Sequence, residues 1–130
     1  MAGLEVGLVG EARAVVESSM LASAVGSGSL EVLSTPWLVA LMEQAACAAV
    51  EDLLGDADQT TVGVRLDIRH LAPSPVRAEV RARAELIEVD GRRLVFRVEA
   101  FDAQERIGEG SHERAVVQAS RLQARADAKR

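Results

Sequence analysis

An acidic residue stands in the middle of an otherwise apolar segment. Residues 34–50, STPWLVALMEQAACAAV, contain Glu43 as their one charged side chain. A buried carboxylate without a partner is costly, so Glu43 must meet an arginine such as Arg65 or Arg69, other hydrogen-bond donors, or solvent in a cavity. On the wall of a cavity, it could act as a nucleophile or as a general base.

Three further residues could take part in such chemistry. Thr35 lies eight residues before Glu43, which is about 12 Å along a straight helix at ~1.5 Å per residue. The two side chains could therefore cooperate only across an extended groove or between two copies of the chain. His70 ends an alternating segment at the expected rim of the core. Gly63 interrupts that segment, which indicates a β-bulge or a close approach of a ligand to the backbone.

The segment around Glu43 is predicted to be a helix. Ser34 or Thr35 can cap its first turn, Pro36 suits the first helical position, and Gly55 provides a stop. Thr35 is also explained by this capping role. Apolar residues from 37 to 54 fall on nearly every side, which predicts a helix surrounded by protein.

The remainder of the chain alternates apolar and polar residues, which predicts β-strands. In the first of these strands, one face is expected to carry Val62, Val64, Leu66, Ile68 and His70. Strands follow at 76–86, 94–100 and 107–118, with a tight Asp-Gly hairpin at 90–91. Residues 12–20 could form a shorter strand. The prediction is an α+β fold in which a curved antiparallel sheet wraps a long central helix.

Length and composition limit the classes of protein. The 130 residues predict a single domain over 1–130, with a Gly/Ser-rich loop at 23–34 and a basic, frayed tail at 121–130. The net charge of −5 argues against a nucleic-acid binder. Long edge strands tend to pair, so we expect a homodimer that joins two sheets, with a tetramer also open.

The cysteine and histidine content argues against other kinds of site. Cys47 is the one cysteine, which excludes an intrachain disulfide and favours a cytoplasmic protein.

The N-terminus does not resemble a signal peptide, and no apolar run is long enough to span a membrane. Two histidines without a recognised ligand spacing predict no metal site.

Three motifs together resemble the hotdog-fold thioesterases, specifically the fluoroacetyl-CoA thioesterase-like family. They are T-P-x-x-x-x-L-M-E from Thr35, V-x-G-R-R-L from Val89, and I-G-x-G-[ST]-H-E-R-A-V from Ile107. The resemblance covers roughly residues 30–118. It implies a dimer of hotdog domains that hydrolyses an acyl-CoA to free acid and thiol. No separate cofactor is implied, because coenzyme A is part of the substrate.

The resemblance also implies roles for particular residues. Thr35, Glu43 and His70 correspond to the catalytic set, and the backbone N–H of Gly63 to the site for the substrate carbonyl. Arg114 corresponds to a residue that lines the site. Glu43 as nucleophile and Glu43 as general base both remain open.

One segment departs from the family pattern. The fluoroacetyl-CoA branch has aromatic residues gating the acyl pocket ahead of the helix, whereas SAVGSGSLEVLS, residues 23–34, contains none. We therefore expect longer or different acyl groups to be admitted. The carrier could be coenzyme A or a carrier protein.

Two other functions are compatible with this fold. A hotdog module could bind acyl-CoA or a small ligand without turnover, although loss of the acid–base residues would then be expected. An enoyl-CoA hydratase would need an aspartate about five residues before its histidine, whereas Asp67 lies three residues before His70.

Overall fold

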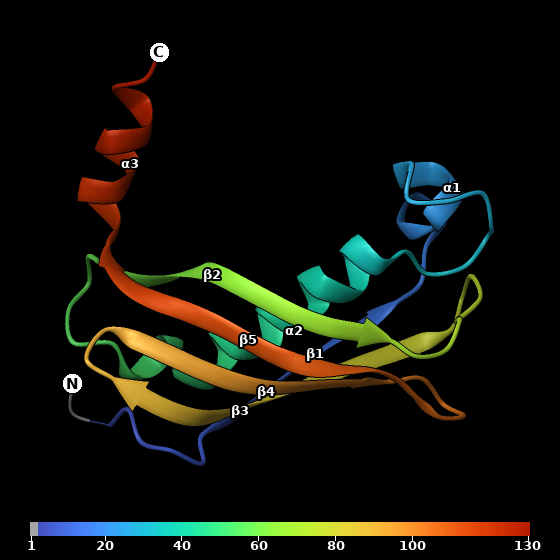
Figure 1. Ribbon diagram of the computed structural model, residues 1–130, viewed down its shortest axis with the longest axis horizontal. Helices are drawn as coiled ribbons and strands as arrows, with labels where there is room; N and C mark the ends of the chain where they lie inside the picture. The colour runs from blue at the N-terminus through green and yellow to red at the C-terminus, as the bar shows by residue number, and fades with distance from the viewer. Residues whose placement is uncertain (1–2) are drawn as a thin grey trace.

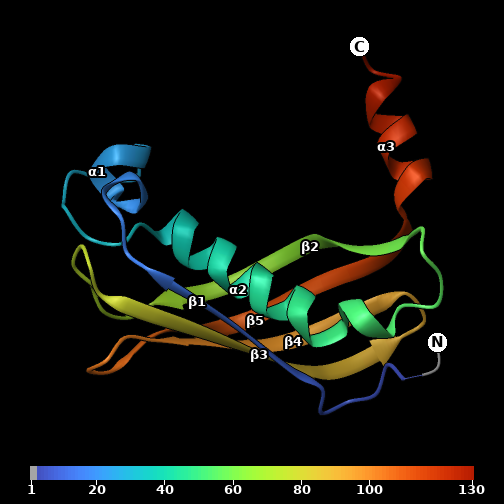
Figure 2. The same cartoon turned by 180° about the vertical axis from the view of Figure 1, so that it is seen from behind.

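The computed structural model describes residues 3–130, and its main feature is one long helix lying across one face of a five-stranded antiparallel sheet (Figures 1 and 2). The strand order is β1-β3-β4-β5-β2. The strands are β1 (Val9–Val15), β2 (Gln59–His70), β3 (Glu79–Asp90), β4 (Arg93–Phe101) and β5 (Arg106–Gln118). The helices are α1 (Ala22–Val25), α2 (Thr35–Val50) and α3 (Ala119–Asp127). The predicted architecture, a curved antiparallel sheet around a central helix, is confirmed.

Local sequence signals explain where α2 begins. The Ser34 hydroxyl oxygen accepts a hydrogen bond from the Trp37 N–H at 3.4 Å, and Pro36 occupies the first turn. The α-helix ends at Val50, and a 3₁₀ turn over Glu51–Leu53 continues toward Gly55.

The prediction that α2 is surrounded by protein is wrong within a single chain. Gln44 and Ala48 are exposed, and Glu43 and Cys47 are half-buried, so the helix is not surrounded by protein. The reason is geometric, because a single sheet can cover only one side of a helix. Alanine-rich turns are compatible with either environment, so their composition did not reveal the open side.

The helix backbone lies very close to β1. A Cβ atom added at Gly10 would lie 2.2 Å from the Ala45 carbonyl oxygen and 2.4 Å from the Ala49 nitrogen. Ala84, which pairs with Gly10 on β3, is completely buried. The absence of side-chain atoms at Gly10 therefore sets how closely α2 approaches the sheet.

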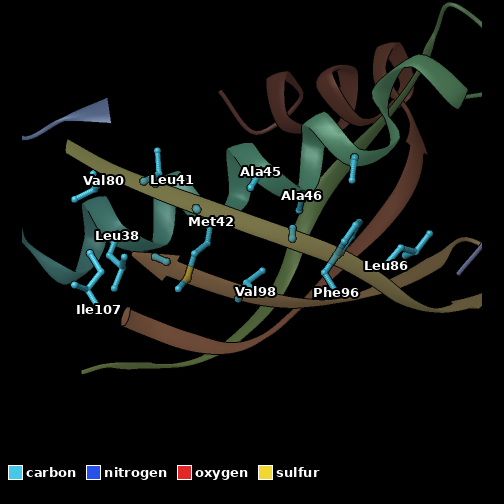
Figure 3. Close-up of a cluster of buried hydrophobic side chains, with 14 of the residues drawn as sticks. Leu38, Leu41, Met42, Ala45, Ala46, Val80, Leu86, Phe96, Val98 and Ile107 are labelled. Atoms are coloured by element: carbon cyan, nitrogen blue, oxygen red, sulfur yellow. The ribbon is translucent and has the colours of Figure 1, made fainter. Parts of the chain in front are cut away.

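The core fills the space between α2 and the inner face of the sheet. In Figure 3 the apolar side chains of α2 point toward those of the strands. Phe96 is the largest fully buried side chain. Around it the core is mostly aliphatic, with Leu38, Met42, Leu86, Leu94, Val98 and Ile107.

The predicted face of β2 is partly wrong because the strand contains a bulge. Its register against β5 shifts between Gly63 and Arg65, so Val64 has no direct partner and is 56% exposed. Gly63 pairs with the buried Arg114, which places it on the helix side. Val62 and Val64 therefore do not share a face with Leu66, whereas Ile68 and His70 do, as predicted.

Short elements occupy the segment before α2 and the C-terminal end. Residues 12–20 contribute to β1 and a 3₁₀ turn, and the loop at 23–34 begins inside the short α1. The predicted basic, frayed tail at 121–130 lies on and after α3, and the side chains after Ala119 are exposed. Among residues 3–130, no helix has both the length and the apolar character needed to cross a membrane.

Replacing Gly10 with Ala is expected to destabilise the fold. The new methyl group would overlap backbone atoms of α2, so the helix must move, at a cost of about 1–3 kcal/mol. Urea unfolding would measure this cost. Gly55→Ala is the matched control, because its Cβ would meet only the end of the Gln59 side chain, at 3.0 Å. Equal stability of the two variants would contradict the close approach.

Candidate active site

Thr35 and His70 form one half of the candidate site. The Thr35 hydroxyl Oγ1 lies 2.8 Å from His70 Nδ1, although the residues are 35 positions apart in the sequence. Burial lowers the pKa of His70, and the nearby Ala72 backbone only partly offsets this effect. The other ring nitrogen, Nε2, is buried and has no hydrogen-bond partner among the described residues. A neutral imidazole beside a hydroxyl can exchange a proton with it or orient it.

The loops that carry this pair are tied together by backbone and side-chain contacts. The Leu33 N–H donates to the Ser74 carbonyl at 2.8 Å, and the buried Ser74 hydroxyl donates to Asp102 Oδ2 at 2.8 Å. Asp102 also accepts backbone N–H groups of Gln104 and Glu105. Burial works to raise the pKa of Asp102, but these hydrogen bonds outweigh it and hold the pKa below its ordinary value. The segment before α2 is thus fixed relative to the segment after His70.

Glu43 and Arg114 form the second half. Arg114 Nη1 lies 3.4 Å from Glu43 Oε2, and the side chain of Arg114 is 7% exposed while that of Glu43 is 37% exposed. Arg114 Nε donates to Thr61 Oγ1 and Nη2 donates to the Thr61 carbonyl, both at 2.9 Å. The guanidinium is therefore fixed to β2, whereas the carboxylate in front of it keeps access to solvent. An arginine partner was expected for Glu43, with Arg65 or Arg69 as examples. The arginine that Glu43 contacts is Arg114.

Gly63 completes this second half by lacking a side chain. A Cβ atom at Gly63 would lie 2.6 Å from Glu43 Oε2 and 3.5 Å from Arg114 Nη1. Only glycine leaves room for the carboxylate against the strand. The predicted bulge follows immediately at Val64.

His112 is a site residue that the sequence reasoning missed. It is 1% exposed, its Nδ1 lies 2.9 Å from the Arg65 carbonyl oxygen, and its Nε2 lies 3.0 Å from Arg114 Nη1. The sequence signal that could have identified His112 is its position two residues before Arg114 in the H-E-R motif. Alternation along β5 puts residues 112 and 114 on the same face.

Both halves open onto hollows. A groove of about 460 Å³ is lined by Glu43 and Arg114 together with Ala40, Gln44, Cys47, Ala48 and Glu51. Thr35 and His70 line two smaller hollows of about 340 and 320 Å³. The larger of these contains small and aliphatic residues from the segment before α2, including Ala22, Gly28, Leu30 and Val32.

The structure does not bring the predicted catalytic residues into one cluster within a single chain. Thr35 contacts His70, whereas Glu43, Gly63 and Arg114 lie together two helical turns away along α2. Within residues 3–130, no cluster of three or more histidine, cysteine or acidic residues could hold a metal ion.

Comparisons with known proteins identify the family. A fluoroacetyl-CoA thioesterase of Streptantibioticus cattleyicolor is 38% identical over 95 residues, covering 73% of this chain and 68% of the relative. A solved structure of a fluoroacetyl-CoA thioesterase superposes with a TM-score of 0.91 at 31% identity, over 98% of each chain. A hot-dog-like protein from Thermanaerovibrio acidaminovorans gives 0.84 at 26% identity, over 95% of this chain and 91% of that protein. The model of the fluoroacetyl-CoA-specific thioesterase family matches residues 16–120, and the chain therefore belongs to that family.

Proposed function

We propose that the protein hydrolyses an acyl-CoA thioester to a free acid and coenzyme A, with Glu43 as the reacting carboxylate. The observation that carries this proposal is the placement of Glu43 on an open groove beside a buried, fully oriented arginine. Family membership supports the same reaction.

A homodimer would join the two halves of the site. Within residues 3–130, β2 is an edge strand that pairs on one side only, and the side of α2 next to it is open. In a two-fold antiparallel β2–β2 pair centred near Leu66 and Asp67, Gly63 of one protomer would lie opposite His70 of the other. The Thr35–His70 pair of one chain would then face Glu43 of its partner.

The chemistry follows from these positions. As the thioester carbonyl is attacked, negative charge develops on its oxygen, and the Gly63 N–H would stabilise that charge. Glu43 either attacks the carbonyl carbon, giving an anhydride that water cleaves, or removes a proton from the attacking water. The Thr35–His70 pair would orient the attacked group or the water and supply the proton that the leaving thiolate needs.

The acyl group would lie in the hollow between Thr35 and the segment before α2. Apart from His70, the lining of that hollow consists of small and aliphatic residues, with no Phe, Tyr or Trp. This lining favours small to medium acyl chains without selecting for fluorine. Solved structures of relatives include complexes with acetyl-CoA and with fluoroacetate and CoA.

The first test replaces Glu43 with Gln, which preserves side-chain shape but removes the carboxylate. We expect thiol release from a panel of acyl-CoAs to fall by at least about 100-fold. Isothermal titration should show that acyl-CoA binding is retained. A native protein that binds acyl-CoA without releasing thiol would instead be a binding module, and full activity in Glu43→Gln would exclude Glu43 as the reacting group.

The composite site can be tested by mixing two inactive variants, Thr35→Ala and Glu43→Gln, after unfolding and refolding them together. Half of the dimers would be mixed, and each would contain one intact site, so about a quarter of native activity should return. If both halves came from one chain, every site would keep one lesion and no activity would return. Light scattering would establish the dimer independently.

Gly63→Ala is expected to reduce activity with little loss of stability. The added methyl group meets the mobile end of Glu43, so the side chain can move aside at a cost below about 1 kcal/mol. The displaced carboxylate should lower kcat by about 100-fold. Gly55→Ala again serves as control, because its methyl group also meets a flexible side-chain end, away from the site. Native kcat in Gly63→Ala would contradict the close fit.

A further inference from the structure

His112 is a buried histidine to which the proposed chemistry gives no role. Its side chain lies on β5, and the ring centroid is 6.3 Å from that of Phe96 on β4. A buried imidazole must satisfy two nitrogen atoms, so the identity of its partners matters. One partner is the Arg65 carbonyl on β2, and the other is the guanidinium of Arg114.

The partners determine which ring nitrogen carries the proton. A guanidinium can only donate hydrogen bonds, so Nε2 of His112 must accept from Arg114 Nη1 at 3.0 Å. Nδ1 must then carry the proton and donate it to the Arg65 carbonyl oxygen at 2.9 Å. His112 is therefore held as the neutral tautomer with its proton on Nδ1.

Arg114 is held at both ends of its planar group. Thr61 accepts from Nε and Nη2, and His112 accepts from Nη1, the same nitrogen that faces Glu43 at 3.4 Å. The contact to His112 is the shorter of the two that Nη1 makes. The orientation of Arg114 therefore does not depend on Glu43.

We propose that His112 is a positioning residue that keeps Arg114 aimed at the place where Glu43 reacts. This inference rests on the proposed function of Glu43. A carboxylate that attacks a carbonyl or takes a proton must loosen its contact with its arginine partner during each turnover. Arg114 then still has His112 and Thr61 as partners, so it stays in place for the carboxylate's return.

The charges around His112 support the same role. Arg114 approaches the ring from β5 and Glu43 from α2, and β2 contributes the Arg65 carbonyl. Burial lowers the pKa of His112 most, and the charge of Arg114 lowers it further, against opposing effects of the Arg65 carbonyl and Glu43. Protonation would place an N–H against the Arg114 N–H groups and push the guanidinium away. Activity should therefore fall with acidification below the ordinary histidine pKa of about 6.5.

Two substitutions separate the two hydrogen bonds of His112. Asn places an amide nitrogen near the position of Nδ1, so His112→Asn can keep the bond to Arg65 but loses the acceptor for Arg114. Gln places an amide oxygen near the position of Nε2, so His112→Gln keeps the acceptor for Arg114. Each variant loses one buried hydrogen bond and the packing of the imidazole ring. The two variants should therefore lose similar stability, and each serves as a control for the other.

The expected result is a difference in kcat between variants of similar melting temperature. His112→Asn should lose about tenfold or more in kcat with KM nearly unchanged, whereas His112→Gln should stay within about threefold of the native kcat. The acid limb of kcat/KM should also become shallower in His112→Gln, because His70 would be the remaining titrating histidine. Equal kcat in the two variants, or an unchanged acid limb, would overturn the inference.

A measurement without substrate tests the same geometry. In ¹⁵N spectra, the Arg114 Nη1–H that donates to His112 should exchange slowly with water in the native protein and in His112→Gln, and faster in His112→Asn. Equal exchange in all three proteins would overturn the positioning role even if hydrolysis is observed. A native protein that shows this exchange pattern but no hydrolysis would contradict the proposed function and leave the geometric role of His112 supported.

Discussion

The distance between α2 and the sheet is the constraint on which the rest of the molecule depends. At Gly10 the helix backbone lies so close to the strand that no Cβ atom would fit. At Gly63 the Glu43 carboxylate occupies the space that a Cβ atom would need. Close packing of this kind gives large dispersion energy from small side chains. It helps to explain how a chain with only 2% aromatic residues builds a fully buried core.

That close approach also sets the electrostatics of the site. Because Glu43 lies directly over β2, the guanidinium beneath it has to be buried, and a buried charge needs a full set of partners. Arg114 has them in Thr61, His112 and Glu43. The carboxylate is the one member of this network with substantial exposure, so it is the member that a substrate can reach. The same network leaves Arg114 and His112 inaccessible as reacting groups.

The open side of α2 and the free edge of β2 have the same cause. A five-stranded sheet wraps only part of a helix, and the uncovered part contains the groove at Glu43. A second copy of the chain paired along β2 would cover this side and bring Thr35 and His70 to the groove. In this view, the site residues lie two turns apart on one helix because each half serves a different protomer.

The sequence by itself determined the features that depend on local chemistry. The Ser34 cap with Pro36 predicted the start of α2, and period-two alternation predicted the inner face of β3. The Asp-Gly pair predicted the β3–β4 hairpin, although Asp90 pairs with Arg93 and the turn lies one residue later, at 91–92. The family motifs indicated which side chains to examine.

Tertiary structure decided the contacts between distant segments. The bulge at Val64 depends on pairing with β5, so the alternation of β2 assigned Val62 to the wrong face. The Glu43–Arg114 pair joins residues 71 positions apart, and His112 has a role only because the sheet places it beside Arg114. Alternation and capping depend on residues that are close in the sequence. The partner of a buried charge depends on strand pairing, which brings distant residues together.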